Sequence, residues 1–124
     1  MDSKEKALKI AKFLYEKKAQ DIVILELKDL TIITDYFVIC SAESTTQVRA
    51  LTEYLEETLS AEEYKPYSIE GSSYAHWVLM DYGDVIVHIF LEETRRFYDL
   101  ERLWLDAPRI HTEFTLDKSR VAYK

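Results

Sequence analysis

The spacing of hydrophobic residues changes several times along the chain, and each change predicts a new secondary-structure element. Near the N-terminus the apolar positions recur every three or four residues, which predicts a short helix that Asp2 or Ser3 can cap. A second helix is predicted after Ser44, because the spacing from Ser44 to Gln47 matches a capping box. The apolar stripes consist of Ala7, Ile10, Ala11 and Leu14 in the first helix and of Val48, Leu51, Leu55 and Leu59 in the second.

Two segments between these helices carry apolar residues on both faces, as the central strands of a covered sheet do. In the first, "DIVILELKDL", the alternating positions from Ile22 to Leu27 face opposite sides, and both sides are largely apolar. The second, "DYFVICS", repeats the pattern. The connector "YKPYSIEG" leaves room for a further short strand.

The stretch "WVLMDYGDVIVHIF" consists of two apolar runs around a turn, which predicts a β-hairpin. A two-residue loop would place Trp77 opposite His88, but it requires Tyr82 at a positive φ, which a bulky residue resists. A three-residue loop, Asp81–Gly83, needs only its glycine in the left-handed region and places Trp77 opposite Val87. We expect the three-residue loop and keep the two-residue loop as the alternative. Both faces of the hairpin then need cover, which helices supply on one side and a partner on part of the other.

The segment "EETRRFYDLERLW" predicts a final helix, and we expect its Phe97 and Trp104 to fill the core. Helices that alternate with strands, together with the hairpin, predict an α/β fold with a mixed β-sheet and flanking helices. Residues 1–106 then form a single domain, and residues 107–124 form a C-terminal tail whose order the sequence leaves open.

Composition narrows the class of protein. A chain of 124 residues, 48% of them apolar, suffices for one domain with its own core. The formal net charge of −7 disfavours extended binding to phosphate backbones and favours a basic partner. A single cysteine, Cys40, excludes an internal disulfide, and no apolar run approaches membrane-spanning length. We therefore expect a cytoplasmic location and no membrane contact.

Positive charge concentrates in residues 1–18, which hold six lysines and three acidic residues. Such a segment either contacts RNA or forms the solvated face of a helix. We favour the solvated face and keep RNA contact as the alternative.

Patterns for catalysis and metal binding are poorly matched. The three histidines form no metal-binding helix motif, so no metal ion is expected. Nucleotidyl transfer would need a phosphate clasp and paired carboxylates, which Gly71-Ser72 and Asp81 with Asp84 imitate only loosely. Turn chemistry alone accounts for these aspartates. Cys40 is expected to be a small buried hydrophobic residue.

Aromatic residues cluster among acidic ones in the last third of the chain, a combination that suits docking to a basic protein. For the residues next to the turn, Trp77 and Tyr82, a core position and a partner contact are both open. The aromatic members are Trp77, Tyr82, Phe97, Tyr98 and Trp104, and the acidic members are Asp81, Asp84, Glu92, Glu93 and Glu101.

Taken together, these residues resemble the ribosomal silencing factor family, which is also called Iojap-related. The resemblance covers roughly residues 4–105. It depends on the combination of "DYFVI", Ser44, "EG" at 70–71, Trp77, "DYGD" at 81–84, His88, "RFY" at 96–98 and "LE" at 100–101. One departure is Ala75-His76, where many members have a glycine followed by an acidic or polar residue.

The resemblance implies a nucleotidyltransferase-like layer fold without the catalytic carboxylates, and therefore a binding protein that is not an enzyme and needs no cofactor. It implies binding to the large ribosomal subunit through large-subunit ribosomal protein fourteen. This binding would block joining of the small subunit and repress translation when nutrients are scarce. The alternative is a residual nucleotidyltransferase or nucleotide-binding module.

Five residues are expected near the partner: the aromatic anchors Trp77 and Tyr82, the acidic Asp81 and Glu92, and the hydrogen-bonding His88. A minor contact of residues 1–18 with ribosomal RNA and a homodimer of the free protein are further expectations.

Overall fold

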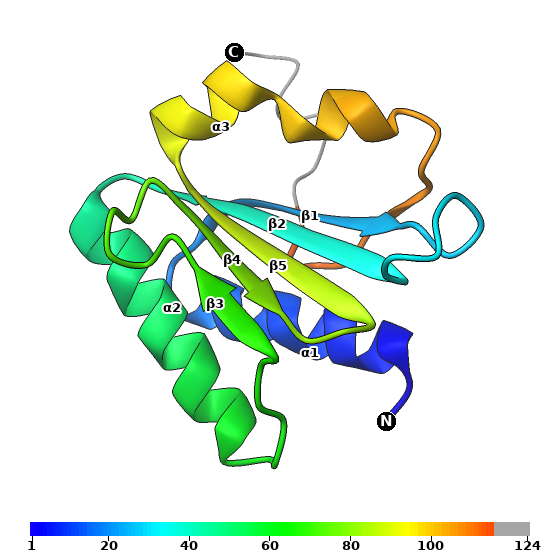
Figure 1. Cartoon of the computed structure of the whole chain (residues 1–124), viewed down its shortest axis with the longest axis horizontal. Coiled ribbons are helices and arrows are strands. Elements are labelled where there is room, and N and C mark those ends of the chain that lie inside the picture. Colours follow the sequence, from blue (N-terminus) through cyan, green and yellow to red (C-terminus); the bar gives the residue numbers. More distant parts are fainter. Residues whose placement is uncertain (116–124) are drawn as a thin grey trace.

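Residues 1–115 are described by the computed structural model, and their six strands form one mixed sheet in the order β3-β4-β5-β2-β1-β6 (Figure 1). The strands are β1 (Gln20–Glu26), β2 (Tyr36–Ala42), β3 (Ser68–Glu70), β4 (Trp77–Asp81), β5 (Val85–Leu91) and β6 (Arg109–Ile110). The helices are α1 (Ser3–Glu16), α2 (Thr45–Ser60), α3 (Glu92–Tyr98) and the 3₁₀-helix η1 (Leu100–Trp104). The predicted α/β class with a mixed sheet and flanking helices is confirmed.

The two predicted central strands lie in the middle of the sheet. β2 is buried along its whole length and pairs in parallel with β5, while all other strand pairs are antiparallel. On β1, Ile22 and Ile24 belong to the core beneath α1 and α2, whereas Val23 and Leu25 belong to a second core on the opposite face. The prediction that these strands are apolar on both faces is confirmed.

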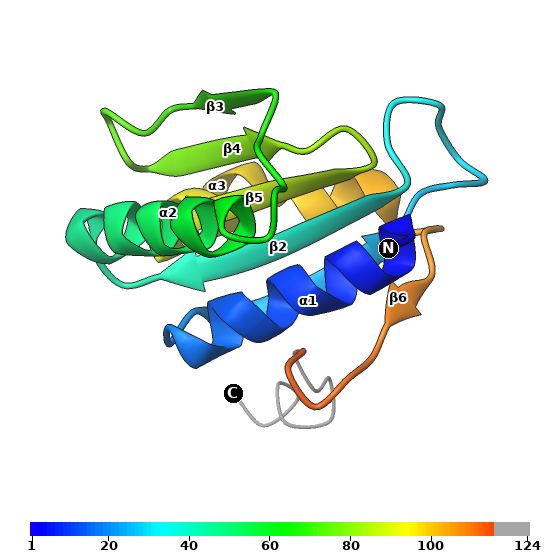
Figure 2. The ribbon, with the colours of Figure 1, turned by 90° about the horizontal axis from the view of Figure 1, so that it is seen from below.

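α1 and α2 lie side by side across one face of the sheet (Figure 2). Both begin where a side chain caps the helix: the Glu5 amide donates to Asp2 Oδ1 at 2.8 Å, and the Gln47 amide donates to Ser44 Oγ at 3.1 Å. All eight residues of the two predicted apolar stripes are fully buried against the sheet, as expected.

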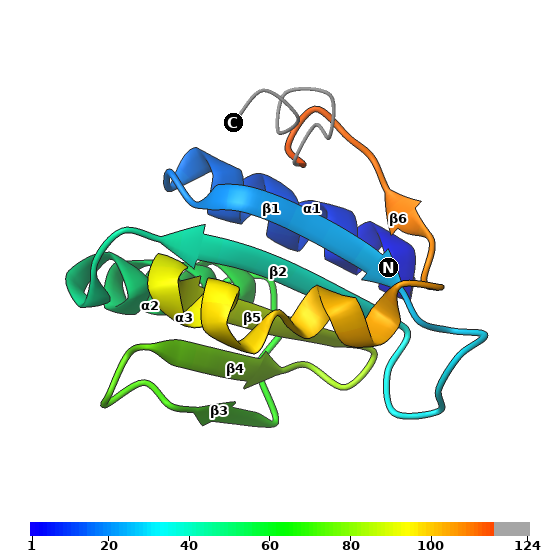
Figure 3. The ribbon, with the colours of Figure 1, turned by 90° about the horizontal axis from the view of Figure 1, so that it is seen from above.

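The opposite face is partly covered by α3 and η1 (Figure 3). The prediction of one continuous final helix is wrong, because Asp99 adopts a left-handed conformation with φ 47° and ψ 54° that ends α3 before η1 begins. The break also changes which residues reach the core. Trp104 packs on the second core and meets Phe37 edge to face at 5.9 Å, but Phe97 is 81% exposed, contrary to expectation.

The β4–β5 hairpin has neither of the two registers considered from the sequence. Trp77 lies opposite Phe90, and Leu79 lies opposite His88. The Tyr82 amide donates to the Val85 carbonyl at 2.9 Å, which leaves a two-residue loop, Gly83–Asp84. The glycine occupies its first position with φ +87°, so no bulky residue needs a positive φ.

Contacts from outside the hairpin explain why Asp84 belongs to the loop rather than to the strand. Its carboxylate accepts a hydrogen bond from Lys6 Nζ on α1 at 2.7 Å. Its carbonyl accepts from the amides of Asp35 and Tyr36 at 3.0 and 3.1 Å, where β2 begins. The turn is therefore set by neighbours that are remote in sequence, and local turn preferences alone could not identify it.

The first residues of the expected tail join the sheet. β6 pairs with β1 through Ile24–Ile110 and Leu25–Arg109, and Ala107 is buried in the second core. The division at residue 106 stays a prediction, and residues 116–124 lie outside the described residues. Within residues 1–115, no helix is both long enough and apolar enough to span a bilayer.

Candidate docking site

On the side of α3 the sheet is only partly covered. α3 and η1 lie over β5 and β2, whereas no described element lies over this face of β4 and β3 (Figure 3). Trp77 and Leu79 of β4 pack against the second core here but remain half-buried. Beside them α3 exposes Phe97 and Tyr98. The result is a strip of apolar surface along one edge of α3.

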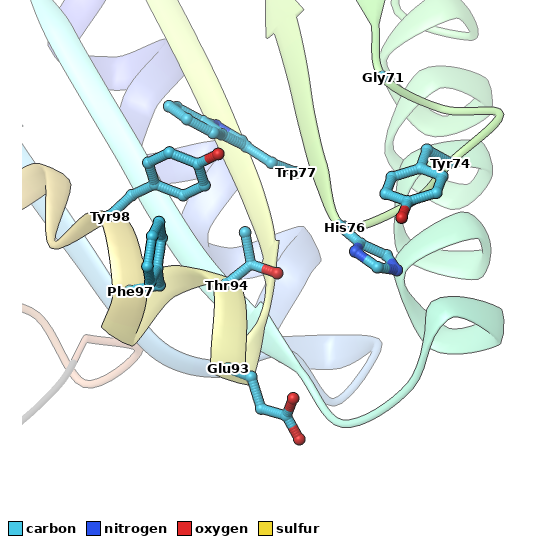
Figure 4. Close-up of a pocket in the computed structure, with 8 residues that line it drawn as sticks. All are labelled: Gly71, Tyr74, His76, Trp77, Glu93, Thr94, Phe97 and Tyr98. Carbon is cyan, nitrogen blue, oxygen red and sulfur yellow. The ribbon is translucent and has the colours of Figure 1, made fainter.

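A groove of about 560 Å³ separates this strip from the loop that enters β4 (Figure 4). One wall is aromatic: the Tyr98 ring lies 5.0 Å from Trp77 and 5.1 Å from Phe97. The other wall carries Tyr74 and His76, whose rings lie 4.1 Å apart. We call this feature the aromatic groove; it is lined by Gly71, Tyr74, His76, Trp77, Glu93, Thr94, Phe97 and Tyr98. Two aromatic walls favour a flat or apolar side chain between them.

The loop that carries Tyr74 and His76 depends on two positive-φ positions. Gly71 has φ +86°, and a Cβ atom there would lie 2.2 Å from the Trp77 carbonyl oxygen. Ala75 has φ +60°, is buried, and donates its amide to the Gly71 carbonyl at 2.9 Å. Glycine adopts such a conformation without strain, which gives a physical reason for the glycine that the resemblance led us to expect in place of Ala75.

The Trp77 side chain is hydrogen-bonded to His88 of the neighbouring strand β5. The indole Nε1–H donates to His88 Nδ1 at 3.0 Å, and the indole stacks on Phe90 at 4.7 Å. His88 itself is only 3% exposed and meets the edge of Phe37 at 4.5 Å. Burial among these uncharged rings lowers the pKa of His88 to about 4, so the imidazole is neutral at physiological pH and its Nδ1 lone pair can accept.

Negative charge lies at the start of α3. Glu92 and Glu93 form its first turn, where the helix dipole favours carboxylates. Glu92 pairs with Arg96 at 2.8 Å on the exposed surface. Glu93 lines the aromatic groove, and Figure 4 shows its carboxylate pointing away from the aromatic side chains. A basic side chain that approaches the groove therefore meets a carboxylate at its border.

The five residues expected near a partner do not form one surface. Trp77, Asp81 and His88 point to the face covered by α3, but only Trp77 lines the groove. Tyr82 is 4% exposed and lies in the core on the face of α1 and α2, where burial raises the pKa of its hydroxyl. Glu92 is exposed at the start of α3. Strand alternation and the observed register separate Tyr82 from Trp77.

The two aspartates of the turn do not converge. Asp81 Oδ1 accepts from the Gly83 amide at 2.8 Å, as turn chemistry predicts, while the Asp84 carboxylate is paired with Lys6 on the other side of the sheet. Among residues 1–115 no group of three or more His, Cys, Asp or Glu side chains could hold a metal ion. Cys40 is fully buried, and burial raises the pKa of its thiol to about 12, far from that of a nucleophile.

Several lysines of residues 1–18 have partners within the protein. Lys6 pairs with Asp84, and Lys9 pairs with Glu62. The ammonium of Lys17 lies 5.2 Å from the centre of the Tyr54 ring, within the range of a cation–π contact. These contacts engage three of the six lysines within the protein, and contact of residues 1–18 with RNA stays a prediction.

Sequence reasoning missed most of the groove. Tyr74 and Thr94 were not predicted as site residues, His76 was weighed only as a metal ligand, and Phe97 was expected in the core. One signal was present: Gly71 closely followed by aromatic residues marks a tight loop next to exposed rings. The opposite wall could not be found this way, because α3 meets the loop only in the folded protein.

Comparisons with known proteins agree with this architecture. The family described as "Ribosomal silencing factor during starvation" matches residues 1–124. The Ribosomal silencing factor RsfS of Halalkalibacterium halodurans is 40% identical over 98 residues, which are 79% of this chain and 84% of that protein. Protein Iojap of maize chloroplasts is 33% identical over 87% of this chain and 47% of its own. A crystal structure of a protein from Chromobacterium violaceum has a TM-score of 0.79 at 33% identity and covers 84% of this chain and 87% of its own.

These matches define a class of regulatory proteins named for silencing ribosomes, and they confirm the resemblance drawn from the sequence. The chain belongs to the ribosomal silencing factor family.

Proposed function

We propose that this chain binds the large ribosomal subunit through large-subunit ribosomal protein fourteen, sterically blocks joining of the small subunit, and so represses translation when nutrients are scarce. Membership of the family supports ribosome association. The observation that carries the proposal is the partly uncovered face of β4 next to the aromatic groove. A strip of exposed aromatic side chains beside carboxylates suits a basic protein surface, because aromatic anchors supply affinity and opposite charge guides encounter.

Within the proposed contact, the expected residues take different positions. Trp77 and Glu92 reach the surface on or beside the groove, and Asp81 reaches it at the far end of β4. Tyr82 and His88 are too buried to touch a partner that docks on this face. We therefore assign direct contact to the first three and add Phe97 and Tyr98, which are exposed aromatic residues of the same groove.

Cosedimentation with purified large subunits tests the proposal. The wild type is expected to pellet with the subunit, and Phe97→Ala is expected to bind about tenfold more weakly, as loss of a moderate interface anchor does. Tyr15→Ala on α1 is the matched control, because Tyr15 is also an exposed aromatic but lies on the opposite helical layer. Equal loss in both variants, or no pelleting of the wild type, would refute docking at this face.

The steric block requires a second measurement. Light scattering reports the joining of purified small and large subunits, and the wild type is expected to lower its amplitude in proportion to the bound fraction. Phe97→Ala should require a correspondingly higher concentration for the same effect. Full joining at saturating protein would show that binding does not block the subunit interface.

We further propose that the same face binds a second copy of this chain when no ribosome is available, since exposed apolar strips favour association. Sedimentation equilibrium should then show a dimer that Phe97→Ala weakens and Tyr15→Ala leaves unchanged. A wild type that stays monomeric at high concentration would exclude this use of the face.

A further inference from the structure

The orientation of Trp77 in the groove depends on a residue that does not itself line the groove. We infer that His88 is a positioning residue, whose imidazole holds the Trp77 indole as a wall of the docking groove. This inference rests on the proposed docking function and adds a buried residue that acts on the partner only through Trp77.

The hydrogen bond between the two side chains fixes the state of the imidazole. Because Nδ1 accepts from the indole at 3.0 Å, a neutral His88 carries its proton on Nε2. Nε2 is buried and has no hydrogen-bond partner among residues 1–115. An unsatisfied buried donor is unfavourable, and an apolar residue at this position would avoid it. The benefit of a histidine here is therefore the acceptor that it offers to Trp77.

The acceptor is itself held in place. His88 lies opposite Leu79 and Trp77 lies opposite Phe90, so their contact runs diagonally across the β4–β5 pair, within reach of large side chains. The imidazole meets the edge of Phe37 at 4.5 Å and lies nearly parallel to Phe90, with an interplanar angle of 16°. The rings of Phe37 and Phe90 limit the rotation of the imidazole, so its Nδ1 stays in one place relative to the indole.

The side-chain torsion of Trp77 about Cβ–Cγ has two broad minima, which differ in the edge that the indole turns towards His88. The indole stacks on Phe90 with an interplanar angle of 28° and meets Tyr98 at 5.0 Å. A half-turn of the ring about Cβ–Cγ would keep the plane of the indole and exchange its two edges, because this bond lies in that plane. The half-turn would move Nε1 away from His88, so the hydrogen bond decides which edge of the indole faces the groove.

NMR on uniformly ¹⁵N-labelled protein tests the positioning directly, without any ribosome. A Trp104→Phe background leaves Trp77 as the only indole. We expect a scalar coupling through the hydrogen bond from Trp77 Nε1 to His88 Nδ1 and slow exchange of the indole proton. His88→Phe keeps a ring but removes the acceptor, and should abolish the coupling and change the cross-peaks from the indole to Tyr98. His88→Asn places an oxygen acceptor near the position of Nδ1 and should restore slow exchange.

Binding to large subunits then links the orientation to docking. We expect His88→Phe to weaken binding about tenfold, and His88→Asn to recover most of this loss. In a Trp77→Phe background His88→Phe should have no further effect on binding, because a residue that acts through Trp77 has nothing left to position. A further loss in that background would overturn the inference, as would unchanged binding by His88→Phe in an otherwise wild-type chain that binds.

The test separates the inference from the proposed function. If the wild type does not bind large subunits, the docking proposal falls and the NMR comparison alone decides the inference. An indole orientation that is the same in wild type and His88→Phe then overturns it, and an altered orientation that His88→Asn restores supports it.

Discussion

The Arg95 guanidinium donates to Ser41 Oγ at 2.8 Å and so joins α3 to the central strand β2. The same group donates to the Asp21 carbonyl at 2.7 Å and pairs with Glu101 of η1 at 3.1 Å. A helix as short as α3 is not stable alone. Arg95 therefore anchors the element that carries one wall of the aromatic groove.

Replacing Arg95 with methionine should lower the free energy of unfolding by about 3 kcal/mol, because Glu101 is left partly buried without its partner. The neighbouring exposed pair of Arg96 with Glu92 provides the control, and Arg96→Met should cost less than about 0.5 kcal/mol. Urea denaturation of both variants measures the difference. Similar losses in the two would mean that Arg95 is not the anchor.

Gly71→Ala should destabilise the fold by about 2 to 4 kcal/mol, because the new methyl group collides with the Trp77 carbonyl and the backbone has a positive φ. Gly83→Ala tests mainly the cost of a positive φ for a residue with a side chain. The nearest atoms there belong to the exposed ring of Tyr67, which can move aside. We expect a loss of about 1 kcal/mol for that control. Thermal or urea unfolding checks the order, and a larger loss at Gly83 would contradict the close approach at Gly71.

Because of His88, the protein should become less stable as the pH is lowered. Its pKa is about 4 in the folded protein and 6.5 ordinarily. Between these values the unfolded chain binds the extra proton and the folded chain does not. The free energy of unfolding should therefore decrease as the pH falls from about 6.5 to about 4, by about 3 kcal/mol in total, and His88 should contribute no slope above this window.

His88→Asn lacks this titration, so it serves as the comparison for the pH profile. Urea unfolding of both proteins at several pH values should show the advantage of the wild type shrinking towards pH 4. A difference between the two that stays constant across the window would show that another group is responsible for any pH dependence.

Charge reversal at the groove should weaken ribosome binding in a salt-dependent manner. Glu93→Lys is expected to lower affinity for large subunits about tenfold at low salt, and less at high salt as screening increases. Glu53→Lys on α2 makes the same change in net charge on the opposite helical layer. If both variants lose affinity equally, overall charge rather than this groove governs the association.

The pattern of apolar residues was enough to predict those helices and strands whose burial depends on their own sequence. The stripe from Val48 to Leu59 buries one face of α2 wherever the helix docks, so periodicity alone identifies it. The apolar run from Tyr36 to Cys40 in β2 likewise predicts that both faces of the strand are covered. These features follow from the sequence before any tertiary contact is known.

The errors arose where remote contacts decide between local alternatives. Asp84 belongs to the turn because Lys6 and the start of β2 hold it there, and the hairpin register follows from that. Phe97 is exposed because the left-handed Asp99 redirects the chain after α3. Tyr82 was expected in an exposed turn, but it is buried in the core because the turn consists of Gly83 and Asp84.

The parallel pairing of β2 with β5 has a consequence for the synthesis of the protein itself. The two strands are neighbours in the sheet but about fifty residues apart along the chain. During synthesis from the N-terminus, one edge of β2 therefore stays unpaired, and both of its faces are apolar, until β5 has left the ribosome. Such an edge invites aggregation, and closing so long a connection slows folding. A vulnerable nascent stage thus lasts until Leu91 has emerged.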